Sequence, residues 1–169
     1  MIEQFARLQS LRVVDLDSAN DAAIVYLGAP NNPTGRDVSW DFVESILQRS
    51  SGVVLVDEAY VEYSGRESFA RRAAASERVI VTRTFSKAYG MAGLRVGYGV
   101  ACPALVTLIE QARGPYKVSR SSESQACAVL KRDADWVAST VAQTITMRER
   151  LAERLRDLGL APLPSSANF

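Results

Sequence analysis

The sequence contains no histidine. This absence excludes catalytic triads built on histidine, metal sites with histidine ligands and acid–base catalysis by an imidazole. Only two cysteines are present, Cys102 and Cys127, and they do not form a CxxC pair. We therefore expect small buried thiols in a reducing compartment, with neither a disulfide nor a thiolate metal site.

Long apolar runs and blocks of like charge are also lacking. The chain has 20 basic and 19 acidic side chains, for a formal net charge of +1. No apolar run approaches membrane-spanning length, and the N-terminal MIEQFARLQSLRVV has the pattern of neither a signal peptide nor a transit peptide. We expect a cytoplasmic protein that binds neither nucleic acid nor membranes.

The remaining composition is that of an ordinary globular chain, with 169 residues of which 47% are apolar and 23% charged. This length is sufficient for one domain with its own core. Apolar runs alternate with amphipathic helical patterns, which predicts an α/β fold with a largely parallel sheet. The runs predict strands over residues 12–16, 22–27, 53–56, 78–82 and 94–100.

Several helix boundaries are also readable. Ser39 is a candidate N-cap, Pro103 a first helical residue, and Ser122 with Gln125 has capping-box spacing. An apolar stripe predicts one long helix over residues 135–158, ended by Gly159. An alanine-rich stretch predicts a further helix over residues 67–75.

The stretch TRTFSKAYGMAGLRVGY, residues 82–98, holds one lysine, Lys87, between a serine and an alanine. A lysine amine can attack an aldehyde when its surroundings leave it uncharged. Thr84, Ser86 and Arg95 flank it, and hydroxyls with an arginine can hold a phosphate. This combination indicates pyridoxal phosphate (PLP), which carries both groups. A Ser–Lys pair by itself is commoner on a surface, so the stretch needs support from elsewhere in the chain.

Two further motifs supply that support: GAPNNPTG at residues 28–35 and VVLVDEAYVEY at residues 53–63. Both follow strand-like runs, as Lys87 does. Ligands of open α/β sheets bind beyond the carboxyl ends of the strands, where Asn32, Asp57 and Lys87 are expected to meet. The alternatives are a plain NPTG turn for Asn32 and a loop or capping aspartate for Asp57.

These three motifs, in this order, resemble the fold type I PLP-dependent aminotransferases of class I and II, and most of all the histidinol-phosphate aminotransferase branch. The resemblance runs from about Ala22 to Phe169. It implies a partial large PLP-binding domain over residues 1–132, with a mostly parallel sheet, helices on both faces and an antiparallel fourth strand. Residues 133–169 would form a long linking helix and the start of a small C-terminal domain.

The resemblance also implies roles for individual residues. Lys87 would form the imine with PLP and then move a proton between the substrate's α carbon and the cofactor. Asp57 would pair with the pyridine nitrogen, and Tyr60 and Asn32 would hydrogen-bond the ring's 3-oxygen, with Asn32 also facing the substrate.

The same resemblance implies that Thr84, Ser86 and Arg95 bind the phosphate. For Arg95 the alternative is a surface ion pair. Asn168 matches a position near the substrate. The implied enzyme is a homodimer of histidine biosynthesis that transfers an amino group between an amino acid, or an amino-alcohol phosphate, and a 2-oxo acid.

Members of this family are considerably longer than this chain, so we expect a fragment, truncated at both ends and inactive by itself. Ser119-Arg120 stands where many histidinol-phosphate enzymes have another polar pair, which weakens that substrate assignment. Two alternatives stay open. One is a PLP-dependent decarboxylase or lyase of the same branch, such as the threonine-phosphate decarboxylases, and the other is a truncated chain without catalysis.

Overall fold

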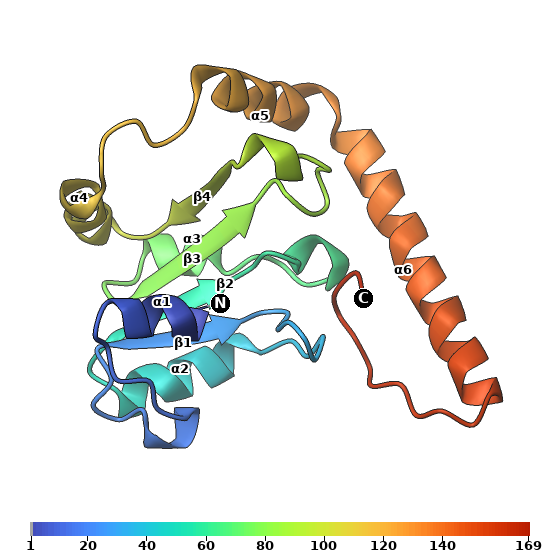
Figure 1. Ribbon diagram of the computed structural model, residues 1–169, viewed down its shortest axis with the longest axis horizontal. Helices are drawn as coiled ribbons and strands as arrows, with labels where there is room; N and C mark the ends of the chain where they lie inside the picture. Colours follow the sequence, from blue (N-terminus) through green and yellow to red (C-terminus); the bar gives the residue numbers. More distant parts are fainter. Residues whose placement is uncertain (1) are drawn as a thin grey trace.

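A four-stranded sheet organises the molecule, and the computed structural model describes residues 2–169 of the chain. The strands lie in the order β1 (Ile24–Gly28), β2 (Val53–Asp57), β3 (Val79–Thr84) and β4 (Gly97–Val100). β1, β2 and β3 run parallel, and β4 runs antiparallel to β3, as its reversed arrow in Figure 1 shows. The predicted α/β class and the reversed fourth strand are both confirmed.

Helices connect the parallel strands, because parallel neighbours cannot be joined by a tight hairpin. α2 (Trp40–Arg49) lies between β1 and β2, and α3 (Ala70–Ala74) between β2 and β3. Ser39 caps α2 as predicted, its Oγ accepting a 3.2 Å hydrogen bond from the Phe42 N–H. α3 is shorter than the predicted helix over residues 67–75. The Phe69 N–H, just before it, donates to Glu58 Oε1 at 2.8 Å.

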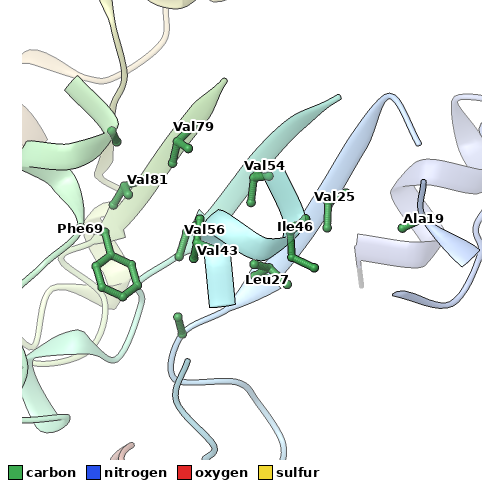
Figure 2. Packing of buried hydrophobic residues seen from close by; sticks show 12 residues of the cluster. Ala19, Val25, Leu27, Val43, Ile46, Val54, Val56, Phe69, Val79 and Val81 are labelled. Carbon is green, nitrogen blue, oxygen red and sulfur yellow. The ribbon is translucent and has the colours of Figure 1, made fainter. Parts of the chain in front are cut away.

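The main core lies between the sheet and these two helices (Figure 2). Alternate residues of the parallel strands are buried there against α2 and the start of α3. The strand residues are Val25, Leu27, Val54, Val56, Val79 and Val81. The intervening residues, among them Tyr26 and Asp57, point to the opposite face, where they are only half-buried.

The C-terminal part of the chain is helical, with α4 (Pro103–Ala112), α5 (Arg120–Arg132) and α6 (Ala134–Asp157). α6 lies beyond the carboxyl ends of β1 to β3, on the right in Figure 1. It packs on η2 (Val61–Tyr63), the 3₁₀ turn that follows β2, through Val137, Val141 and Ile145. After Gly159, which has a φ of 79°, the chain returns to the strand ends.

Three further predictions of secondary structure need correction. Residues 12–16 form no strand; they run into the 3₁₀ turn η1 (Leu16–Ser18) without pairing with the sheet. β4 starts only at Gly97, because residues before it form η3 (Ala92–Leu94) and a left-handed residue, Arg95. α5 is capped by Ser119 rather than Ser122, whose hydroxyl donates to Leu94 O at 2.8 Å.

The remaining elements and the cysteines add little to the site. α1 (Ile2–Leu8) is a short N-terminal helix. Both cysteines are free; Cys102 is buried as predicted, but Cys127 lies on the exposed side of α5, where the prediction of burial is wrong. None of the helices in the described part of the chain has the length and apolar character that crossing a membrane requires.

Candidate active site

Asp57 ends β2, and both of its carboxylate oxygens already accept hydrogen bonds. The Tyr26 hydroxyl donates to Oδ2 at 2.8 Å, and the Ala59 N–H donates to Oδ1 at 3.1 Å. Burial raises the pKa of the Tyr26 phenol, and the hydrogen bond and charge of Asp57 raise it further. Tyr26 therefore keeps its proton and acts as a donor that fixes the orientation of the carboxylate.

Asn32 and Tyr60 meet next to this carboxylate's strand end. Nδ2 of Asn32 donates to the Tyr60 hydroxyl at 3.1 Å, which joins the loop after β1 to the loop after β2. Lys87 Nζ lies 5.3 Å from the centroid of the Tyr60 ring. Tyr60 is buried, whereas Asn32 and Lys87 are exposed, so polar groups of all three motifs gather around one aromatic ring.

The three residues predicted to bind phosphate are brought together only in part. Thr84 Oγ1 accepts from the Ser86 N–H at 3.1 Å, so these two are adjacent in the turn after β3. The Phe85 N–H donates to Val96 O at 3.2 Å, which carries the backbone of Arg95 to the same turn. Its guanidinium is exposed and donates to Ala92 O at 2.8 Å rather than to either hydroxyl.

The C-terminal segment 165–169 docks on the same region. The Ser166 N–H donates to Gly35 O at 2.8 Å, and the Phe169 ring packs edge-on against Tyr60 with centroids 5.2 Å apart. Asn168 is exposed but close to Tyr63. Burial raises the pKa of the Tyr63 phenol, the charge of Glu62 adds to this, and the Asn168 side chain opposes it.

Sequence reasoning missed two groups of residues in this region. Tyr26 sits in an apolar run that predicts a strand and nothing more. The signal for its role is that Tyr26, paired with Leu55, lies on the same face of the sheet as Asp57. Glu58, which follows Asp57, is fully buried with Arg66, Ser68 and the Phe69 N–H as its partners. The signal for Glu58 is that it continues the alternation of buried residues Val54 and Val56, although it is charged.

A separate groove of about 440 Å³ lies between α6 and the turn after Lys87. Its lining is mainly apolar and includes Tyr89, Val137, Val141 and Ile145, with Glu62 at its edge. None of the predicted site residues lines it; these are Asn32, Asp57, Tyr60, Thr84, Ser86, Lys87, Arg95 and Asn168. The polar cluster at the strand ends, and not this groove, is therefore the candidate active site.

Chemically, this cluster offers a fixed carboxylate, an amide and phenol that share a hydrogen bond, and a primary amine. The family model for aminotransferase class I and II matches residues 9–169. The chain belongs to the class I and II aminotransferase family. The matched residues include all three motifs at the strand ends.

Two relatives with similar sequences are histidinol-phosphate aminotransferases. The chain is 41% identical over 152 residues to the histidinol-phosphate aminotransferase of Corynebacterium glutamicum, covering 89% of this chain and 41% of the relative. It is 40% identical over 169 residues to histidinol-phosphate aminotransferase 3 of Burkholderia lata, covering 99% and 45%. The chain spans less than half the length of these relatives.

Solved structures agree on the fold. The histidinol-phosphate aminotransferase of Sinorhizobium meliloti, determined in complex with pyridoxal-5'-phosphate, superposes with a TM-score of 0.87 at 29% identity, covering 98% of this chain and 50% of that one. A decarboxylase from Sulfurospirillum multivorans superposes with a TM-score of 0.72 at 21% identity, covering 97% and 46%. At that lower identity the likeness concerns the fold alone.

Proposed function

We propose that the protein containing this chain is a PLP-dependent aminotransferase. The observation that carries the proposal is the meeting of Asp57, Asn32, Tyr60 and Lys87 at the carboxyl ends of the parallel strands. Family membership supports the reaction class. A relative of this fold in complex with pyridoxal-5'-phosphate supports the cofactor.

The residues of this chain fit PLP by the chemistry of their donors and acceptors. The Asp57 carboxylate would face the protonated ring nitrogen, and its own two donors leave it oriented for that contact. Asn32 and the Tyr60 hydroxyl would bond the 3-oxygen. Thr84, Ser86 and Arg95 would bind the phosphate, which requires the Arg95 guanidinium to leave Ala92 O.

When bound, PLP supplies an electron-withdrawing ring that stabilises negative charge at the substrate's α carbon. Lys87 would hold the cofactor covalently before substrate arrives and afterwards carry the proton that leaves the α carbon. The Phe169 ring packs against Tyr60 and would hold the Tyr60 hydroxyl in place. Asn168 and Asn32 would face the substrate.

The substrate pair we propose is an amino acid or a histidinol-phosphate-like amino-alcohol phosphate, with a 2-oxo acid as acceptor. The names of the relatives at 40–41% identity support it. We further propose that residues 1–132 are part of the cofactor domain and that 133–169 link it to a smaller one. The long helix α6, packed mainly on η2, supports this division.

We also propose a homodimer in the cytoplasm. α4 has no buried residue, and Leu108 on it is 61% exposed, which is a surface that a second copy would cover. Two unpaired cysteines suit a reducing compartment. Sedimentation of the purified protein tests the dimer, and a monomer at micromolar concentration would contradict it.

The deciding experiment is transamination by the protein that contains this chain, with PLP added. Histidinol phosphate and several amino acids are supplied with and without 2-oxoglutarate. We expect turnover that stops without the 2-oxo acid. Release of carbon dioxide without any acceptor would instead indicate the decarboxylase alternative, and PLP binding without either product would indicate a chain that does not catalyse.

A further inference from the structure

The guanidinium of Arg66 joins segments that are far apart in the sequence. Nη2 donates to Ala29 O at 2.9 Å, Nε to Asp37 Oδ2 at 2.9 Å and Nη1 to Glu58 Oε1 at 2.8 Å. Nη1 also donates to Glu67 O at 2.9 Å. Arginine suits this position because its planar fork directs several donors at once, which a lysine ammonium cannot reproduce.

Two of these acceptors are the start and the end of the loop that carries Asn32. Ala29 opens the loop after β1, and Asp37 closes it before α2. Inside, the Asn31 N–H donates to Arg36 O at 2.8 Å and the Gly35 N–H to Asn31 O at 2.7 Å. Asn31 Nδ2 also donates to Thr34 Oγ1 at 2.8 Å. One cation therefore closes a loop whose internal hydrogen bonds join residues 31–36 only to one another.

The third acceptor, Glu58, connects Arg66 and the closed loop to the end of the strand that bears Asp57. Glu58 is fully buried and directly follows Asp57. Its carboxylate also accepts from Ser68 Oγ at 2.5 Å and from the Phe69 N–H at 2.8 Å. A buried carboxylate is strongly disfavoured without a cation, so Glu58 and Arg66 hold each other in place.

We propose that Arg66 is a positioning residue that holds Asn32 within hydrogen-bond reach of Tyr60. It touches neither side chain; it fixes the two ends of the Asn32 loop relative to the β2 end, and Asn32 then reaches the Tyr60 hydroxyl at 3.1 Å. The consequence for bound PLP rests on the proposed function. Through Asn32, Arg66 would set the hydrogen bonding of the cofactor's 3-oxygen and with it the pH dependence of the bound cofactor's visible band.

The first readout compares two variants with the wild type. Arg66→Lys keeps a cation but loses the fork, and Asp37→Ala removes the acceptor at the loop end while leaving the Arg66–Glu58 pair. Hydrogen exchange of the Asn31 and Gly35 amides is measured on residues 1–169 without PLP. We expect roughly tenfold faster exchange at both amides in both variants, since each loses protection when the loop opens.

The second readout is a pH titration of the visible absorbance of the PLP-loaded protein. Arg66→Lys and Asn32→Ala should shift the midpoint in the same direction, and the double variant should shift it no further than Asn32→Ala does, because the two act through one hydrogen bond. Additive shifts would show that Arg66 does not act through Asn32.

Arg78→Lys is the matched control. Arg78 donates to Leu47 O and Ser50 O, both at 2.6 Å, at the amino ends of the strands. The Arg78→Lys protein should be less stable than the wild type, but hydrogen exchange at the Asn31 and Gly35 amides should be unchanged. Unchanged exchange in Arg66→Lys and Asp37→Ala would overturn the proposal. Because this measurement needs no PLP, it decides the matter even if the protein binds no cofactor and the proposed function fails.

Discussion

The Tyr26 hydroxyl donates a 2.8 Å hydrogen bond to Oδ2 of Asp57 from the neighbouring parallel strand. In the register of β1 and β2, Tyr26 pairs with Leu55, so Asp57 is its diagonal neighbour on the same face. The bond lies on the face opposite the main core. Together with the Ala59 N–H, which donates to Oδ1, it gives the carboxylate two oriented donors before any ligand is bound.

Tyr26→Phe should remove that donor and destabilise the fold by about 1–2 kcal/mol, the usual range for a hydrogen bond to a charged group. The folded pKa of Tyr26 is raised, so its stabilising contribution is complete below the ordinary phenol pKa of about 10 and is lost as the pH rises above that value. Urea unfolding of both proteins between pH 8 and pH 11 should show their difference shrinking above about pH 10.

Tyr116→Phe serves as the control, because the Tyr116 side chain is fully exposed. It should leave the unfolding free energy unchanged at each pH. A Tyr26→Phe protein that matches wild type below pH 10 would show that the hydrogen bond to Asp57 contributes nothing to stability.

Lys87 should be the residue that borohydride fixes to PLP in the protein that contains this chain. The chain's other two lysines, Lys117 and Lys131, lie elsewhere: Lys117 is ion-paired with Glu110 and Lys131 is in the last turn of α5. Peptide mapping after reduction should find the pyridoxyl group on Lys87 alone, and Lys87→Ala should abolish labelling. Labelling of Lys117 or Lys131 in wild type would contradict the assignment.

Asp57→Ala should still permit PLP to be fixed by borohydride but should lower turnover by roughly 10²–10⁴-fold, the usual loss when a positioned electrostatic or proton-transfer group is removed. Asp57→Asn is the matched variant, since it keeps the size and an acceptor for Tyr26 while losing the charge. Both should be measured by single-turnover reaction with an amino donor. Equal rates in Asp57→Asn and wild type would show that the charge is not required.

Much of the fold follows from the sequence, because buried parallel strands are short apolar runs and the turns between them carry Asn, Pro and Gly. Topology alone brings Asn32, Asp57 and Lys87 to one edge of the sheet. The residues 12–16 show the limit of that reasoning: they have the composition of a strand but no neighbour to pair with.

The parts that sequence reasoning missed depend on contacts between distant residues. Nothing local marks Arg66 as the partner of both Glu58 and Asp37, and only the strand register shows that Tyr26 reaches Asp57. Arg95 shows the reverse case. It is close to Ser86 along the chain, yet its left-handed backbone and its bond to Ala92 O direct the guanidinium elsewhere.

Gly35 and Ser165 form the contact through which the C-terminal segment docks on the Asn32 loop. Gly35 has a φ of 69°, and a Cβ there would lie 2.9 Å from Ser165 Cα, too close for a backbone atom. Gly35→Ala should therefore both strain the loop and displace residues 165–169. The Phe169 ring would then leave Tyr60, and Arg148 would lose its 2.7 Å hydrogen bond to Ala167 O.

Gly65 provides the matched control, because its φ of 75° imposes similar backbone strain while nothing lies within 4 Å of the added Cβ. Gly65→Ala should cost about 1 kcal/mol from strain alone. Gly35→Ala should cost more, and limited proteolysis should then cut the 160–169 segment at least tenfold faster in Gly35→Ala than in Gly65→Ala. Equal cleavage rates would mean that the segment does not depend on this contact, and that Arg148 and the Tyr60–Phe169 packing suffice to hold it over the candidate active site.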